Sequence, residues 1–222
     1  SRQNMLVNKW DKWDDVKKLD YIGKTVLDVN TIIDLNSYIR EFASLFKGAH
    51  GLKRKKEEID FKDSIYKFQD GFKDILEDLG IEVELTVTAG YLKGMFMNKA
   101  SWESIILNLF SNSIKALGNV QRKRKYIKIN FEKTTYELKI QVKDNGSGIE
   151  EDNFERIFDP LWTSYKGSEN AGTGMGITIV REILEGYDGD LWVKTSKYEK
   201  DFPGQGGTTM ELSISLDKLN DD

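Results

Sequence analysis

The chain has 222 residues, 39% of them hydrophobic and 32% charged, which fits one large domain or one domain with an extension. Its formal net charge of −4 favours neither nucleic acid nor a membrane surface as a partner. Without an apolar stretch long enough to span a membrane, or a signal peptide at the start, we expect a cytoplasmic chain.

Cysteine is absent and there is one histidine, His50. Disulfides, thiolate zinc sites and cysteine nucleophiles are therefore excluded, and a histidine-rich metal site is disfavoured. A bound metal would be a cation that prefers oxygen ligands, such as Mg2+.

Residues 1–58 are predicted to form a helical segment ahead of the main domain. Between 22 and 46, apolar side chains recur at spacings of three and four, as on one face of a long amphipathic helix. A shorter helical pattern containing Trp10 and Trp13 precedes it. A helix as long as 22–46 suits packing against another helix or a dimer interface. The stretch 46–60 breaks the pattern with glycines and charges, so we interpret it as a linker or a helix end.

Residues 59–222 alternate between helical and strand patterns, and the strands come in adjacent pairs. This arrangement is typical of an α+β domain with helices on one face of a mostly antiparallel sheet. Helices are predicted over 61–80, 99–117 and 176–187, and strands over 81–88, 126–132, 136–144, 189–196 and 208–216.

Three polar side chains share one face of the otherwise apolar helix 99–117, in the stretch NLFSNSIKA. Asn108 and Asn112 are one helical turn apart, and Lys115 follows on the same face. Two amide oxygens at this spacing suit a divalent cation, and a lysine suits phosphate oxygens. The alternative is that the asparagines cap the helix or face solvent.

A carboxylate ends the predicted strand 136–144 and is followed by alternating glycines, in the stretch DNGSGI. Asp144, beside the open backbone of Gly146 and Gly148, can accept a hydrogen bond from an exocyclic amine such as that of adenine. The alternative is an ordinary turn, because Asp-Asn-Gly is common turn chemistry.

Three further glycines, Gly172, Gly174 and Gly176, lie at alternate positions just before a helix. Glycine weakens helices and strands, so such a cluster indicates special backbone angles or a group lying close to the main chain. The first N–H groups of a helix lack partners and the dipole there is positive, so the position suits a phosphate. The cluster lacks the spacing of a P-loop, so alone it is weak evidence for a phosphate site. It becomes informative because it follows the other two motifs in order along the chain.

In this order the motifs resemble those of the GHKL-type ATP-binding fold shared by sensor histidine kinases, gyrase B, Hsp90 and MutL. NLFSNSIKA resembles its N box, DNGSGI its G1 box, FERIFDPLWTS its F box and GTGMGITIV its G2 box, and GQGGTTMELSISL resembles the stretch that closes the domain. The resemblance covers roughly residues 61–217 and is closest to the catalytic domain of histidine kinases. It implies a two-layer α/β sandwich, preceded here by the helical segment, that binds ATP and Mg2+ under a flexible lid.

The resemblance also implies roles for residues at matching positions. Asp144 would accept from the adenine amine, Asn112 would ligate magnesium together with Asn108, and Lys115 would face the phosphates. The lid would span about 156–172, with Phe158 packed at its base. The implied ATP-binding residues are Asn112, Asp144, Gly146, Gly148, Ile149, Gly172, Thr173, Gly174, Met175, Gly176 and Thr208, and the implied catalytic residues are Asn108 and Lys115.

One position separates the branches of this fold. The hydrolysing branches carry a glutamate four residues before the magnesium asparagine, where it activates water, and here that position holds Asn108. An amide cannot act as a general base, so the resemblance favours a phosphotransferase of the histidine-kinase type over an ATPase. Glu103 lies at the wrong spacing for the base, and we interpret it as a surface carboxylate.

The acceptor histidine expected of such a kinase is not evident. Residues 1–47 contain no histidine, and His50 follows the long helix too near the ATP-binding domain, so we interpret it as a linker residue. Three accounts stay open: the sequence begins after the acceptor, another chain carries it, or ATP acts as a conformational switch.

Expected partners are ATP, a second copy through the N-terminal helices, and a phosphoacceptor or response-regulator protein. The basic run QRKRK is interpreted as a solvated loop rather than a nucleic-acid contact.

Overall fold

The computed structural model describes residues 55–89, 92–163 and 174–220. All of them belong to the second of the two compact units into which the chain divides, Ser1–Gly51 and Leu52–Asp222. Several sequence predictions lie outside the described residues: the N-terminal helices up to residue 46, the linker role of His50, and the ATP-binding roles of Gly172 and Thr173.

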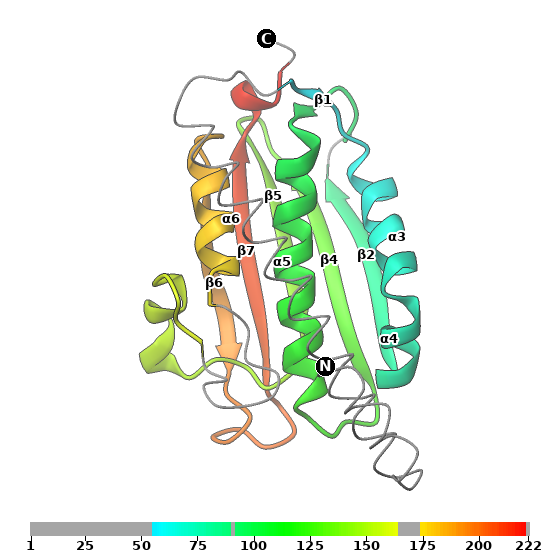
Figure 1. Cartoon of the computed structure of the whole chain (residues 1–222), viewed down its shortest axis with the longest axis vertical. Helices are drawn as coiled ribbons and strands as arrows, with labels where there is room; N and C mark the ends of the chain where they lie inside the picture. The colour runs from blue at the N-terminus through cyan, green and yellow to red at the C-terminus, as the bar shows by residue number, and fades with distance from the viewer. Residues whose placement is uncertain (1–54, 90–91, 164–173, 221–222) are drawn as a thin grey trace, which may run out of the picture. The chain divides into compact units, whose positions relative to one another are not determined.

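A five-stranded sheet forms one layer of the second unit (Figure 1), with the strands in the order β2-β4-β5-β7-β6. Their bounds are Ile81–Ala89 for β2, Lys125–Lys133 for β4, Glu137–Asp144 for β5, Asp190–Lys197 for β6 and Gly207–Ser215 for β7. β2 runs parallel to β4 and the other neighbours are antiparallel, which confirms the predicted mostly antiparallel sheet.

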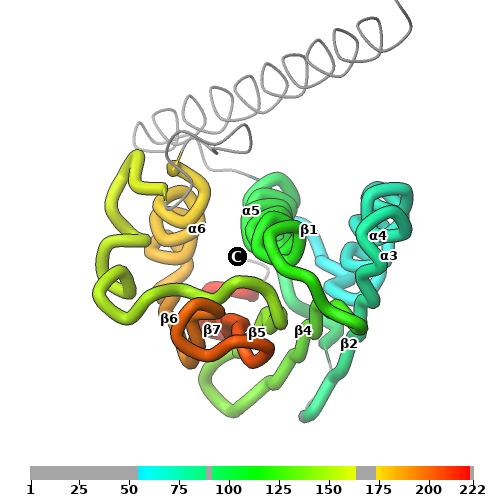
Figure 2. Tube along the Cα trace, turned by 90° about the horizontal axis from the view of Figure 1, so that it is seen from below, coloured from blue at the N-terminus to red at the C-terminus, as the bar shows by residue number. Residues whose placement is uncertain are grey.

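The helices form a second layer on one face of this sheet, as the view from below shows (Figure 2). α4 contacts β2, α5 contacts β4 and β5, and α6 contacts β6. The bounds are Phe61–Gly71 for α3, Lys73–Leu79 for α4, Lys99–Gly118 for α5 and Gly176–Glu185 for α6, with short 3₁₀ helices η1 at Glu151–Asn153, η2 at Arg156–Phe158 and η3 at Leu216–Leu219. The predicted two-layer α+β sandwich is confirmed.

A second, two-stranded sheet joins the start of the described chain to the segment before α5. β1 (Glu57–Glu58) pairs antiparallel with β3 (Phe96–Met97), and the Ile59 N–H donates to the Met95 carbonyl at 2.9 Å. The interpretation of 46–60 as a linker or helix end therefore needs correction at its C-terminal end. A strand of two residues is too short to show a periodic pattern in the sequence.

The helix predicted over 61–80 is two helices, α3 and α4, separated at Phe72. Phe72 has φ −102° and ψ 9°, away from helical values. Gly71 before it is a weak helix former, and the Phe72 ring packs on that of Phe110 in α5, with centroids 5.6 Å apart. Gly80 ends α4 in the left-handed conformation, at φ 64°, which glycine adopts without a steric penalty.

Buried apolar side chains hold α5 against the sheet. The rings of Phe61, Trp102 and Phe131 pack together, and the Phe61 and Trp102 centroids are 4.6 Å apart at an interplanar angle of 79°. Burying each such side chain contributes about 1.5–3 kcal/mol. Buried and less buried residues alternate along β4 and β5, and the buried ones extend this core: Ile127, Ile129, Leu138, Ile140 and Val142. This packing fixes the helix that carries the polar residues of the N-box motif.

Candidate nucleotide-binding site

Asp144 lies at the end of β5 and is buried, with 6% of its surface exposed. Its carboxylate accepts hydrogen bonds from the Gly146 N–H at 2.8 Å, from the Ser113 hydroxyl at 3.3 Å and from the backbone of Thr208. Burial raises the pKa of Asp144 to about 6, against the lowering effect of these donors. A carboxylate that the protein holds in place and makes costly to ionise is a candidate functional group.

Strand pairing brings three of the predicted residues together. Asp144 lies opposite Thr208 of β7, and the Thr208 hydroxyl is 3.1 Å from the Ser196 hydroxyl of β6. Ser196 Oγ also accepts from the Ile149 N–H at 2.7 Å. Asp144, Ile149 and Thr208 thus belong to one polar cluster. Sequence reasoning missed Ser113 and Ser196, because a lone serine carries no spacing signal, although Ser113 lies inside the N-box motif.

Gly146 and Gly148 are required because protein lies against them. A Cβ on Gly146 would stand 2.7 Å from the backbone carbon and the Cβ of Ala116 in α5. Gly148 has φ +70°, and a Cβ there would overlap the Lys197 carbonyl oxygen of β6. The turn after β5 is therefore packed between α5 and β6. The predicted approach of a nucleotide to these glycines stays a prediction.

The predicted metal and phosphate residues lie along α5 beside the start of α6. Asn108 is 5% exposed, and its Nδ2 donates to the Ser104 carbonyl at 2.9 Å. Its Oδ1 is 2.5 Å from where a Cβ on Gly176 would stand, so a glycine is needed at the first position of α6. One turn further along α5, Asn112 is exposed and Lys115 is half-buried. Met175, the N-cap residue of α6, makes no side-chain cap hydrogen bond, and the N-terminus of a helix suits an anion.

The described start of the predicted lid packs against α6. The Phe158 carbonyl accepts from the Thr178 hydroxyl at 3.3 Å, and the Arg181 guanidinium lies 5.1 Å from the Phe158 ring centroid. The Leu161 N–H donates to the Gly174 carbonyl at 3.1 Å, and Gly174 has φ +71°. Phe158 therefore packs against α6 at the start of the predicted lid, and the role of residues 156–172 as a lid stays a prediction that lies mostly outside the described residues.

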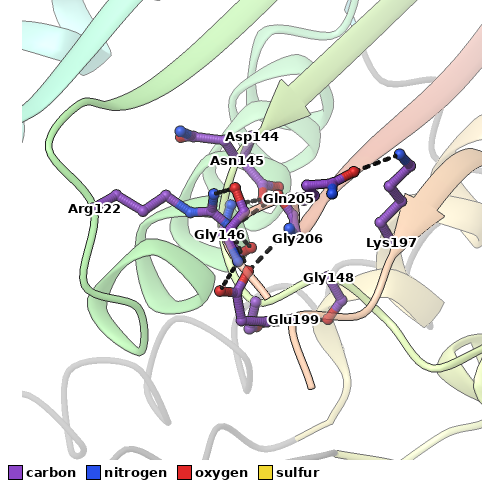
Figure 3. A network of polar contacts seen from close by, with 12 residues as sticks. Arg122, Asp144, Asn145, Gly146, Gly148, Lys197, Glu199, Gln205 and Gly206 are labelled. Atoms are coloured by element: carbon purple, nitrogen blue, oxygen red, sulfur yellow. Dashed lines mark hydrogen bonds and ion pairs between the residues drawn. The ribbon is translucent and has the colours of Figure 1, made fainter. Parts of the chain in front are cut away.

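The basic run QRKRK is not uniformly solvated, which corrects its interpretation at Arg122 (Figure 3). The Arg122 side chain is 11% exposed and forms an ion pair with Glu199. Its Nη1 donates to the Gly204 carbonyl at 2.7 Å and its Nη2 to the Gly206 carbonyl at 3.1 Å. These partners lie 77 or more residues further along the chain, so no local pattern signals the burial. Arg124 in the same run is 63% exposed, as interpreted.

The side chains of the described residues suit a cation held by amide oxygens and phosphate rather than by a cluster of carboxylates or imidazoles. Among these residues, no three histidine, cysteine, aspartate or glutamate side chains gather to hold a metal. The protein ligands of a cation would then be amide oxygens such as that of the exposed Asn112, with phosphate and water completing the shell.

Glu103 is exposed, as expected for a surface carboxylate. Across the residues that the structure describes, no helix is both long enough and apolar enough to cross a membrane.

The fold and the motif residues place the chain in a known family. The model of the histidine kinase-, DNA gyrase B-, and HSP90-like ATPases matches residues 98–218, which is more than half of the chain. The chain therefore belongs to this family, and the resemblance inferred from its motifs is confirmed. The match runs from the residue that caps α5 through β7, so it includes Asn112, Asp144 and Thr208.

Sensor proteins and histidine kinases are similar to this chain. The phytochrome-like protein Cph1 of Synechocystis is 30% identical over 149 residues, which are 67% of this chain and 18% of that protein. The histidine kinase AdeS of Acinetobacter baumannii has a TM-score of 0.63 at 19% identity, covering 96% of this chain and 92% of that one. The histidine kinase ThkA in complex with the response regulator protein TrrA has a TM-score of 0.59 at 19% identity, covering 96% and 56%. The chain spans about a fifth of the length of Cph1.

Proposed function

We propose that this chain binds Mg-ATP and donates the γ-phosphate to a histidine outside it, as in a two-component sensor kinase. The observation that carries the proposal is Asp144, a buried carboxylate held by protein donors at the end of β5. An acceptor held in this way suits recognition of the exocyclic amine of adenine. Membership of the ATPase family and the likeness to histidine kinases support nucleotide use.

The residues along α5 and at the start of α6 would bind the phosphates. Asn112 is exposed and Lys115 half-buried, so both are accessible to a magnesium triphosphate. Mg2+, when bound, would neutralise charge that develops on the transferred phosphoryl group. The N-terminus of α6 at Gly176 would add partial positive charge. Asn108 stands where hydrolysing relatives carry a glutamate, and an amide at that position does not activate water.

The acceptor histidine is proposed to come from outside the residues described. The sequence has a single histidine, His50, and it does not fit the place of a phosphoacceptor. ThkA forms a complex with the response regulator TrrA. We propose a response regulator as a partner here too, together with a second copy of this chain through residues 1–58.

The single histidine also favours a second candidate, an ATP-gated interaction protein. In that function ATP would bind at the same site, order the lid and change the contacts with a partner, with little turnover. A ligand acts in this way when it binds one conformation better than the other.

ATP labelled at the γ-phosphate distinguishes these functions. Label on protein and label released as phosphate are followed with Mg2+, with nucleotide binding measured in parallel. A kinase region should bind ATP, release little phosphate and transfer label when a helical hairpin with an acceptor histidine is supplied. Binding without transfer to that hairpin favours the switch. Rapid release of phosphate without labelled protein would refute both and identify an ATPase.

A further inference from the structure

An ion pair outside the predicted site bonds two loops to the turn that follows Asp144. We propose that Arg122 and Glu199 position this turn, residues 144–148, for the base of the nucleotide, and that the preference for adenine depends on them. The inference rests on the proposed function and extends it. We call these two side chains the Arg122–Glu199 pair.

Arg122 links three segments through its guanidinium group (Figure 3). It lies in the loop between α5 and β4 and donates to carbonyls in the two other segments. Its Nη2 is 3.5 Å from the Gly146 oxygen in the turn after β5, and its other acceptors are the Gly204 and Gly206 carbonyls in the β6–β7 loop. A planar fork of N–H donors serves acceptors in several directions at once, which a lysine ammonium does not match.

Glu199 completes the pair from the β6–β7 loop. Its carboxylate accepts from the N–H groups of Gly204 at 2.7 Å and Gly206 at 2.9 Å, and its own N–H donates to the Ser147 carbonyl at 2.8 Å. The Gly204 N–H is the main cause that lowers the pKa of Glu199, so the side chain stays ionised as the counter-charge of Arg122. Arg122 therefore reaches the turn through its side chain and Glu199 through its main-chain N–H, while the Glu199 carboxylate holds Arg122 and the β6–β7 loop.

The β6–β7 loop lies directly against the turn. A Cβ on Gly206 would stand 2.7 Å from the Gly146 carbonyl oxygen, and one on Gly207 would stand 2.5 Å from that of Asp144. Because so little space separates them, a shift of the loop toward the turn would require the turn to shift as well. Because the Arg122–Glu199 pair bonds the loop to the turn, its loss should displace the Asp144 carboxylate.

Arg122 also acts on Asp144 through its charge. The positive guanidinium lowers the pKa of the Asp144 carboxyl and so opposes the burial that raises it. The other groups that act on this carboxylate, within the described ranges, are the neutral donors of Ser113, Gly146 and Thr208. Arg122 therefore favours the ionised form, which accepts a hydrogen bond from an amine.

Calorimetric binding of ADP with Mg2+ to the whole chain tests the inference. Arg122→Met removes the donor fork, Arg122→Lys keeps a charge, and Glu199→Gln removes the counter-charge. Arg124→Met is the matched control, because Arg124 belongs to the same basic run but is 63% exposed. We expect Arg122→Met to weaken ADP binding about 10- to 100-fold, as when a group that orients a ligand-binding residue is lost. The two milder variants should lose less, and Arg124→Met should stay within about twofold of the unaltered chain.

Inosine diphosphate separates base recognition from a general effect on folding. Its base carries an oxygen where adenine carries the exocyclic amine, so it cannot donate to Asp144 as adenine does. The unaltered chain should prefer ADP, and Arg122→Met should lose most of that preference. If Arg122→Met weakens both nucleotides equally, so that their ratio is unchanged, the inference is overturned.

Two further outcomes are distinguished by the design. If a thermal melt shows that Arg122→Met does not fold, Arg122→Lys and Glu199→Gln decide, because the first keeps the positive charge and the second keeps the shape of the side chain it replaces. Binding of ADP by these two variants as tight as by Arg124→Met refutes the inference while leaving the proposed function standing. Failure of the unaltered chain to bind ADP refutes the proposed function, and the inference falls with it.

Discussion

The two ends of the candidate site differ in how much protein surrounds them. At the end of β5, Asp144 is 6% exposed and is held by donors from three segments, whereas along α5 Asn112 is exposed and Lys115 is half-buried. A group fixed before the ligand arrives avoids the ordering cost of binding. An exposed amide and ammonium leave room for a hydrated cation and its phosphates. In the proposed function, base recognition would therefore be built into the fold, while phosphate binding would depend on the ligand and its metal. We call the Asp144 end of the candidate site the closed end, and the end with Asn112 and Lys115 the open end.

Removing the charge of the buried carboxylate should have the largest effect. We expect Asp144→Asn to weaken ADP binding at least about a hundredfold, because an amide can present a donor to the amine of the base. Folding should survive at neutral pH, since the variant removes a carboxyl group whose pKa burial raises to about 6. Calorimetry and a thermal melt measure the two effects. An unchanged ADP affinity would remove Asp144 from the base site.

A side chain added at a glycine of the turn should destabilise the fold more than one added at a glycine with free space around it. We expect Gly148→Ala to destabilise the fold by roughly 2–4 kcal/mol, because the Cβ would overlap the Lys197 carbonyl at a backbone φ of +70°. Gly80→Ala is the matched control: φ there is +64° with no atom within 4 Å, so it should cost only about 1 kcal/mol. Urea denaturation measures both, and equal losses would show that the turn has room to shift.

The open end should respond to Asn112→Ala only when the metal is present. We expect the affinity for Mg-ATP to fall about tenfold, and the affinity for ADP in EDTA to stay the same, because the amide binds the cation rather than the base. Glu103→Gln, an exposed change on the same helix, is the control and should alter neither value. A loss of equal size with and without Mg2+ would contradict the metal-ligand role.

Nucleotide binding and folding should show opposite pH trends at the closed end. The pKa of Asp144 is raised from 3.8 to about 6. Below about pH 6 the carboxylate gains a proton, so it becomes a weaker acceptor that also presents an O–H donor, and ADP binding should weaken by up to about tenfold per pH unit. The raised pKa destabilises the fold above about pH 6, and this penalty is relieved as the pH falls toward 3.8. ADP titrations and melts, each compared with Asp144→Asn, measure both slopes, and ADP binding that strengthens in acid would refute this role of the carboxylate.

The closed end could be predicted in part because its signals are local. Alternating apolar residues define β5 and place Asp144 at its end, and the glycines after it indicated either an open backbone or an ordinary turn. The physical reason for those glycines was not available from the sequence, since Ala116 and Lys197 contact them from other elements. The same holds for Arg122, because the Gly204 and Gly206 carbonyls that accept from it lie 82 and 84 residues away in the chain.

The helix break at Phe72 shows a second limit of local patterns. Apolar spacing continues across the break, and the glycine before it is tolerated in many helices. The conformation of Phe72 goes with a ring contact to Phe110 of another helix, and tertiary packing of this kind overrides propensity. By contrast, Gly80 ends α4 because a glycine readily adopts the left-handed conformation, and this can be inferred from the residue type alone.

One helix carries residues of both ends of the site. In order along α5, these are Asn108, Asn112, Ser113, Lys115 and Ala116. Asn108 and Ala116 are separated by a rise of about 12 Å, so in the proposed function the geometry of this helix, rather than a loop, would set the distance between the phosphates and the base. One residue inserted between them would rotate the two ends by about 100° relative to each other. Such a protein would keep every side chain of the site and still be unable to place both ends of one nucleotide.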